Sequence, residues 1–238
     1  MREIAASSAP QPLDVGDDAS DGAFAAARGD GFSVEAFERR AAGRLIGLDA
    51  PILTFPLRRG DQVLNPDVAE FGRLALRDAA VLIPVVARGD TASVVLTLRT
   101  SHLARHAGQI AFPGGKIDPE DDGPIAAALR EANEEIGLDP AAVQPIGYVD
   151  PYFAGTGFRV FPVVGLIDPA AAVTPNLAEV AEIFEVPLSH LMADANFARE
   201  SRAVGDRHHH FYALRYEARY IWGITAGILR SLFERVYG

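Results

Sequence analysis

Apolar runs of strand length, with few helical segments between them, narrow the possible folds of this chain more than any other feature. Three segments show helical periodicity. The first is expected to begin at Val34, after the capping residue Ser33, and the others cover Pro124–Ile136 and Trp222–Val236. This pattern favours an α/β domain with a mixed sheet over regular βαβ winding. The strand-like runs lie near residues 80–87, 93–98, 143–149, 158–166, 183–186 and 209–216.

Composition excludes several classes of protein. The chain has no cysteine, so neither a disulfide framework nor a thiolate metal site can form. No apolar stretch approaches the roughly 18 uncharged residues of a membrane span, and the first residues lack the apolar core of a secretory signal. The formal net charge is −10, without the basic footprint of a nucleic-acid binder. We therefore expect a cytoplasmic protein that binds neither nucleic acid nor membrane.

The chain divides into three parts by composition. Residues 1–31 are rich in Ala, Ser, Asp, Gly and Pro, and their six acidic residues outnumber two basic ones. Such a stretch buries little surface, which predicts a mobile acidic tail. Residues 32–75 form an N-terminal helical extension in this interpretation, and residues 76–238 form the main domain.

The segment from Gly114 to Leu138 carries the most chemical information. Pro124 suits the first turn of a helix and Gly137 suits the position just past its end. Glu131, Glu134 and Glu135 then lie in the last turns, where like charges repel each other and oppose the helix dipole. A hard divalent cation such as Mg²⁺ would relieve this conflict through oxygen ligands. The alternative is a solvated acidic face in which Arg130 pairs with Glu134.

The residues before this helix point to a known family. Phe112–Lys116 is a glycine-rich turn, and adjacent glycines allow the backbone to approach a ligand closely. Turn, helix and carboxylates together resemble the Nudix box, which is Gly, five residues, Glu, seven residues, then Arg-Glu-apolar-x-Glu-Glu-x-Gly-apolar. The second half matches from Arg130 to Leu138. In the first half the loop is one residue longer, so that Asp121 or Asp122 stands in the early acidic position.

This resemblance implies a Nudix α/β/α sandwich that hydrolyses a diphosphate linkage with Mg²⁺ or Mn²⁺. It implies Glu131, Glu134 and Glu135 as metal ligands, with Glu131 also able to orient the attacking water, and Arg130 as a structural residue that holds the loop through an acidic partner, Asp121. A further carboxylate outside the box is often recruited in this family. The candidates are Glu179, Glu182 and Glu185, of which Glu182 is selected as catalytic.

A second motif narrows the substrate. The stretch Val95–Gly115 is similar to the motif of the coenzyme A pyrophosphatase branch, Leu-Leu-Thr-x-Arg-Ser-x-x-Leu-x-x-His-x-Gly-Gln-x-x-Phe-Pro-Gly-Gly, with Val and Thr replacing the first Leu and the Ser. Ile221–Ala226 also looks like the C-terminal helix of that branch. Arginine and lysine suit phosphate contacts. The substrate-binding candidates are Arg99, Arg105, His106, Gly114, Gly115 and Lys116, although Arg99 as a surface residue and His106 as a loop anchor stay open.

The expected activity is hydrolysis of coenzyme A or its derivatives to 4′-phosphopantetheine and 3′,5′-ADP. One alternative is the same fold acting on another nucleoside diphosphate derivative, such as NADH or ADP-ribose, because fold does not determine substrate. Another is a non-catalytic domain that binds a nucleotide. The expected partner is a small-molecule nucleotide, and a homodimer is allowed because nothing in the sequence decides the oligomeric state.

Overall fold

The structure is a computed structural model that describes residues 31–55, 59–66, 76–102, 107–205 and 207–238. Residues 1–30 of the acidic tail lie outside these ranges, and so do the candidates Arg105 and His106. No helix within the described ranges is long and apolar enough to cross a membrane. The helices are α1 (Val34–Ala41), α2 (Asp61–Leu64), α3 (Gly123–Ile136), α4 (Leu188–Leu191) and α5 (Ile224–Val236), with short 3₁₀ turns η1 (Ile52–Thr54), η3 (Pro140–Ala142) and η4 (Asp194–Asn196).

In the described part of the chain, nine strands form one mixed sheet with the order β1-β7-β8-β2-β3-β4. The long strands β2 and β8 pair in parallel, whereas β3 pairs antiparallel with both β2 and β9. The short strands β4 and β5 pair with β3 and β2, respectively. The strands of this sheet are β1 (Arg59–Gly60), β2 (Arg77–Arg88), β3 (Thr91–Arg99), β4 (Ile110–Ala111), β5 (Gly114–Lys116), β6 (Val143–Tyr148), β7 (Tyr152–Ala154), β8 (Phe158–Ile167) and β9 (Val180–Pro187).

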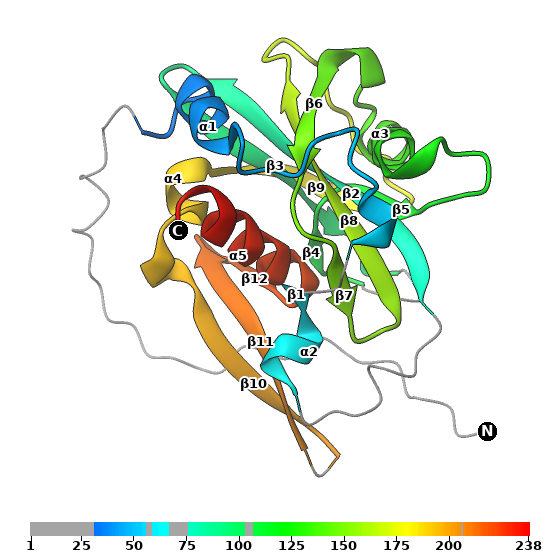
Figure 1. The fold of residues 1–238 in the computed structure, drawn as a ribbon, viewed down its shortest axis with the longest axis vertical. Helices are drawn as coiled ribbons and strands as arrows, with labels where there is room; N and C mark the ends of the chain where they lie inside the picture. The colour runs from blue at the N-terminus through cyan, green and yellow to red at the C-terminus, as the bar shows by residue number, and fades with distance from the viewer. Residues whose placement is uncertain (1–30, 56–58, 67–75, 103–106, 206) are drawn as a thin grey trace.

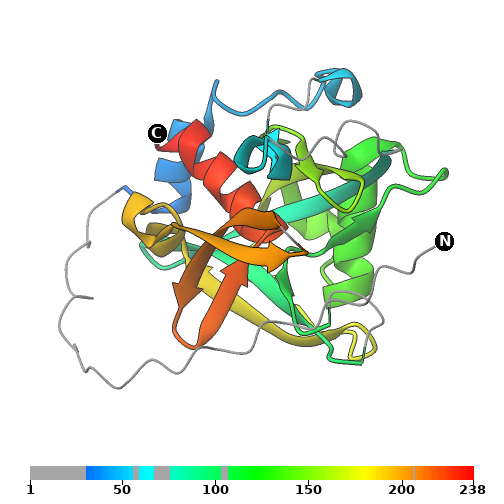
Figure 2. The same cartoon turned by 90° about the horizontal axis from the view of Figure 1, so that it is seen from below.

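Each face of this sheet buries its own hydrophobic core. On one face, α3 packs Ala128 and Ile136 against Leu82 and Phe161 of the strands. On the other, α5 and α1 pack against residues such as Ile83 and Leu96. Figures 1 and 2 show α3 and α5 on opposite sides of the sheet. This arrangement confirms the expected Nudix α/β/α sandwich with a mixed sheet.

Helix α3 has the boundaries that its local sequence predicts. Pro124 lies in its first turn, and Gly137 ends it in a left-handed conformation with φ of 64°. The carbonyl of Asn133 accepts the backbone N–H of Gly137, so the helix ends at Ile136, the residue directly after Glu135. The first helix is also confirmed, because Ser33 caps α1 by accepting the backbone N–H of Ala36 at 3.2 Å.

Other boundaries differ from the prediction for reasons of tertiary structure. Helix α5 begins at Ile224 rather than Trp222, because Gly223 has a φ of 66° and Trp222 ends a strand. That strand belongs to a separate three-stranded sheet with the order β10-β11-β12, formed by β10 (Ala198–Val204), β11 (Arg207–Tyr216) and β12 (Arg219–Trp222). Strand β10 carries no apolar alternation, and it forms because its backbone pairs with β11 along its whole length.

The N-terminal extension is part of the folded domain. Helix α1 contributes Phe37 and Ala41 to the core beside α5. Strand β1 lies parallel to β7, and the buried Asp61 accepts hydrogen bonds from the Tyr152 hydroxyl at 3.0 Å and from the Gly155 backbone N–H at 2.8 Å. The described residues of this extension, 32–55 and 59–66, therefore share a core and hydrogen bonds with the rest of the described chain.

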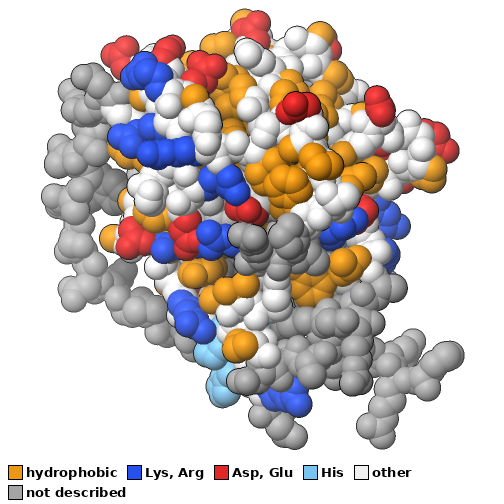
Figure 3. All heavy atoms as spheres, in the orientation of Figure 1, with side chains coloured by type: hydrophobic (Ala, Val, Ile, Leu, Met, Phe, Trp, Pro, Cys, Tyr) orange, Lys and Arg blue, Asp and Glu red, His pale blue; other side chains and the backbone are white. Residues whose placement is uncertain are grey.

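Charged side chains are spread over the surface. On the face that Figure 3 presents, acidic and basic groups are interspersed with apolar ones. Several of these charges form ion pairs between distant segments. Arg159 of β8, for example, binds both carboxylate oxygens of Asp78 at 2.8 Å and also donates to the Leu53 carbonyl. The net negative charge therefore coexists with many local pairs.

Candidate active site

Glu135 is the buried carboxylate at the centre of the candidate site. Helix α3 places it in its last turn, and its side chain is only 3% exposed. Its Oε2 accepts the backbone N–H of Gly114 at 3.1 Å, and its Oε1 accepts Nη1 of Arg99 at 2.9 Å. Burial raises the pKa of Glu135 to about 7, although Arg99 and the Gly114 N–H act in the opposite direction. This carboxylate therefore has less compensating positive charge than its burial demands.

Gly115 makes room for the second carboxylate. A Cβ atom at this position would lie 2.4 Å from Cδ of Glu131, which is a steric overlap. The glycine thus allows Glu131 to lie directly against the backbone of β5. Burial raises the pKa of Glu131, and the charges of Glu134 and Glu179 raise it further against the opposing effect of Arg130. The turn therefore brings the Gly114–Gly115 backbone and two carboxylates of α3 together.

Arg130 ties the loop before α3 to the helix. Its Nε and Nη2 donate to the two carboxylate oxygens of Asp121 at 3.0 and 2.9 Å, and Nη2 also donates to the Lys116 carbonyl at 3.1 Å. Arg130 in turn holds the pKa of Asp121 below its usual value. Asp122 precedes the helix without a side-chain capping bond. Of the two aspartates, Asp121 is thus the partner of Arg130.

Arg130 also reaches the acidic face of α3. Its Nη1 lies 3.1 Å from Oε1 of Glu131 and 3.2 Å from Oε2 of Glu134, the latter side chain being 56% exposed. The pair expected for a purely solvated helix face is therefore present. It coexists with the two-point contact to Asp121, so Arg130 serves the loop and the helix at once.

The three acidic candidates of β9 and the loop before it lie in different places. Glu179 lies nearest to the box, with its Oε2 3.7 Å from Nη2 of Arg99. Glu182 instead accepts Nη2 of Arg219 at 2.5 Å, and Arg219 stacks on Phe184 of the α5-side core. The pairing of β3 with β9 shifts register between Leu98 and Arg99, and Glu179 and Glu182 lie in different surroundings on either side of this shift. The structure therefore does not bring Glu182, the residue selected from the sequence, to the carboxylates of α3.

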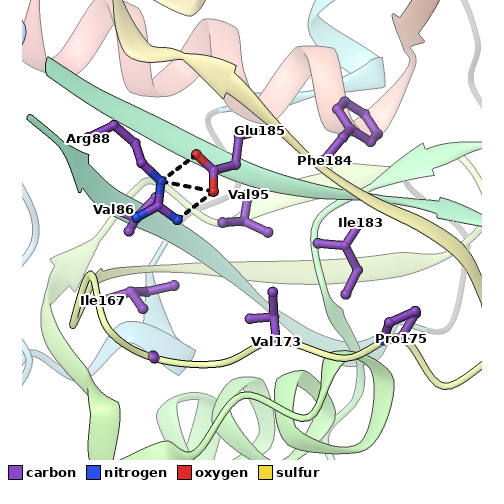
Figure 4. Close-up of a pocket in the computed structure, with 10 residues that line it drawn as sticks. Val86, Arg88, Val95, Ile167, Val173, Pro175, Ile183, Phe184 and Glu185 are labelled. Carbon is purple, nitrogen blue, oxygen red and sulfur yellow. Dashed lines mark hydrogen bonds and ion pairs between the residues drawn. The ribbon is translucent and has the colours of Figure 1, made fainter.

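Glu185 lines a hollow that is distinct from the carboxylates. This hollow has a volume of about 320 Å³ and lies against the α3-side core, with Val86, Val95 and Ile167 in its wall. Figure 4 shows Glu185 bound to Arg88 at its edge, and the shortest contact of the pair is 2.6 Å. None of the α3 glutamates lines it. Glu185 is thus engaged away from the candidate site.

The donor set suits a hard divalent cation. Glu131, Glu134, Glu135 and Glu179 offer only carboxylate oxygens, which Mg²⁺ and Mn²⁺ accept. Burial raises the pKa of both Glu131 and Glu135, so added positive charge would relieve them. In the ranges that the structure describes, however, no three acidic or histidine side chains already converge as a metal site. Arg99 and Arg130 hold the carboxylates instead.

The remaining candidates lie close to this cluster or outside the described ranges. Lys116 follows Gly115 in β5 with an exposed side chain, and Gly114 directs its N–H to Glu135. The sequence predicts Arg99 as a substrate contact, whereas the structure places it between two carboxylates. Glu179 is one of three acidic candidates in the sequence, and its proximity to Arg99 depends on the pairing of β3 with β9, for which the sequence contains no local signal.

The fold and the site together define a hydrolase of the Nudix type. The NUDIX domain family matches residues 76–207. The chain is 42% identical over 172 residues to the Nudix hydrolase NudL of Escherichia coli strain K12, covering 72% of this chain and 88% of that protein. NudL of Yersinia enterocolitica is 42% identical over 158 residues, 66% of this chain and 80% of that protein. The chain belongs to the Nudix family, and its general activity is that of a Nudix pyrophosphohydrolase.

Solved structures in the same family include a Nudix hydrolase from M. Smegmatis, RenU. It is 27% identical, covers 47% of this chain and 70% of its own chain, and has a TM-score of 0.41. The NUDIX domain of Shewanella oneidensis NrtR, complexed with ADP ribose, is 20% identical, with coverage of 50% and 77% and a TM-score of 0.38.

Proposed function

We propose that this protein hydrolyses the pyrophosphate linkage of coenzyme A or its derivatives, giving 4′-phosphopantetheine and 3′,5′-ADP, with Mg²⁺ or Mn²⁺ as cofactor. The observation that carries the chemistry is the gathering of Glu131 and Glu135 at the Gly114–Gly115 turn. The stretch Val95–Gly115 supports the choice of substrate, through its similarity to the coenzyme A pyrophosphatase motif.

The carboxylates of α3 have the central role in this proposal. Glu131, Glu134 and Glu135 would hold the cation, which when bound neutralises charge on the diphosphate and activates water. The Gly114 N–H and the Arg99 guanidinium orient Glu135 toward the turn. Arg130 and Asp121 keep the loop in place, so that the helix presents its carboxylates from a rigid support.

Residues outside α3 complete the proposed site. Glu179 replaces Glu182 as the external carboxylate that accepts a proton from the attacking water, because it lies beside Arg99 and within electrostatic reach of Glu131. Lys116 and the backbone of Gly114 and Gly115 lie where substrate phosphates would approach the turn. Arg99 and His106 stay proposed substrate contacts, the latter outside the described ranges.

The decisive experiment compares three substrates. The protein is incubated with coenzyme A, NADH or ADP-ribose and Mn²⁺, and the products are separated by chromatography. The double variant Glu134→Gln, Glu135→Gln tests the chemistry, and Glu185→Gln serves as the matched control because Glu185 pairs with Arg88 away from the site.

We expect phosphopantetheine from the native protein and the control, and none from the double variant. If coenzyme A survives while NADH or ADP-ribose is cleaved, the substrate assignment is wrong and the metal chemistry stands. Nucleotide binding without turnover of any compound would instead indicate a non-catalytic binding domain.

A further inference from the structure

Arg99 occupies the space between the carboxylates that would hold the cation. It is the last residue of β3, and its side chain is 21% exposed. Its Nη1 donates to Oε1 of Glu135 at 2.9 Å, and its Nη2 lies 3.7 Å from Oε2 of Glu179. One guanidinium thus faces both the central carboxylate of α3 and the external carboxylate.

The contacts of Arg99 differ from those of the structural arginines. Arg130 and Arg159 each bind both carboxylate oxygens of one aspartate through two hydrogen bonds of 2.8 to 3.0 Å, the geometry that makes an arginine–carboxylate pair strong, whatever further contacts Arg130 makes. Arg99 makes a single-point contact to Glu135 and a longer one to Glu179. Its Nε is buried and has no hydrogen-bond partner among the residues that the structure describes.

The negative charge of buried Glu135 explains why a positively charged side chain is needed beside it. Glu135 is almost fully buried, and a buried carboxylate without a counter-charge is costly. A divalent cation bound to Glu135 would supply that charge. It would also repel a guanidinium at the same oxygen, so the cation and Arg99 compete for Glu135.

We propose that Arg99 is the resident counter-ion of Glu135 and Glu179 in the metal-free protein, and that the incoming divalent cation displaces its guanidinium from Glu135. Arg99 is then a positioning residue that keeps the carboxylates in place before the metal binds and lowers the affinity for it. The displaced guanidinium becomes available for an anionic substrate. This inference rests on the proposed metal-dependent function.

The first test measures Mn²⁺ binding without substrate. The protein is stripped of metal by a chelator and titrated with Mn²⁺ in alkaline buffer, with free Mn²⁺ followed by electron paramagnetic resonance. We expect Arg99→Gln to bind Mn²⁺ about tenfold more tightly than the native protein, because the competing charge is gone. Arg99→Lys, which keeps the charge, should lie closer to the native value. Arg88→Gln, which removes an arginine from the exposed pair with Glu185, should not change the affinity.

Weaker or unchanged Mn²⁺ binding by a folded Arg99→Gln protein would overturn the proposal. If coenzyme A hydrolysis by the native protein still required metal, the proposed function would stand without it. If native protein and Arg99→Gln both failed to bind Mn²⁺, the metal assignment and this inference would fall together. Circular dichroism of each variant establishes that it is folded.

The second test observes Arg99 in the native protein and uses a variant only to assign its signal. The Nε–H signal of Arg99 in the native protein is followed by ¹H–¹⁵N nuclear magnetic resonance during a Mg²⁺ titration, and is assigned by its loss in Arg99→Lys. We expect this signal to shift as Mg²⁺ binds, whereas the Nε–H signal of Arg159, bound to Asp78, should stay in place. Saturation with Mg²⁺ without a shift of the Arg99 signal would contradict displacement.

Discussion

At the scale of single residues, the close approach of Gly115 and Glu131 decides whether the turn and the helix can meet. Gly115→Ala would place a methyl group 2.4 Å from Cδ of Glu131. Since a displacement of about 1 Å can cost roughly 100-fold in rate, we expect kcat/KM to fall by about that factor. Steady-state hydrolysis of coenzyme A is the measurement.

The control for this variant is Gly31→Ala, because a Cβ atom there meets no atom within 4 Å. Its kcat/KM should equal that of the native protein. Native-like activity of Gly115→Ala would mean that Glu131 can move away without loss, and that its contact with the turn has no role in turnover.

Glu179 and Glu182 offer a matched comparison at the same scale. If Glu179 accepts the proton of the attacking water, Glu179→Gln should lower kcat by about 100-fold, the lower end of general base contributions. Glu182→Gln should stay near the native kcat, because its carboxylate is paired with Arg219. The reverse order of effects, measured under the same conditions, would return the role to Glu182.

At the scale of elements, the extension before residue 76 is attached to the domain by Asn65. This buried residue donates to the His210 carbonyl at 2.9 Å and accepts the His210 backbone N–H at 2.7 Å, so its amide pairs with β11 as a strand would. Asn65→Ala leaves these backbone groups without partners. We expect a loss of about 1–3 kcal/mol in the free energy of unfolding, measured by urea denaturation.

Val63→Ala in α2, the helix that ends directly before Asn65, is the control, since Val63 is 56% exposed. Its free energy of unfolding should change by no more than about 0.5 kcal/mol. If Asn65→Ala were equally neutral, its two hydrogen bonds with His210 would contribute nothing to the stability of the domain.

At the scale of the whole molecule, the family match of residues 76–207 is shorter than the part of the chain that contributes to the hydrophobic cores. Helix α5 lies beyond residue 207, and its buried side chains Ile228, Leu229 and Leu232 belong to the core on one face of the sheet. Burial of each contributes about 1.5–3 kcal/mol, which together approaches the total stability of a typical domain.

We therefore expect a fragment of residues 76–207 to lack a cooperative unfolding transition. Urea denaturation followed by near-ultraviolet circular dichroism would measure this, with the full chain as reference. A sharp transition of the fragment with native-like stability would show that α1, α2 and α5 are accessory to the fold.

Features that depend on neighbouring residues can be predicted from the sequence alone. Pro124, the alanines after it and Gly137 set the bounds of α3, and the apolar runs of β2 and β8 identify central strands, because local propensity and periodicity act over a few residues. The order of Arg130, Glu131, Glu134 and Glu135 likewise indicates the chemistry of the site, because these spacings gather the carboxylates in the last turns of one helix.

Which distant residues join that site depends on the tertiary structure. Strand β10 forms without an apolar pattern, since its backbone pairs with β11. The pairing of β3 with β9 places Glu179 beside Arg99, which is paired with Glu135, whereas Glu182 is paired with Arg219. Strand pairing and side-chain burial join residues far apart in the chain, and no local pattern in the sequence encodes which of them will meet.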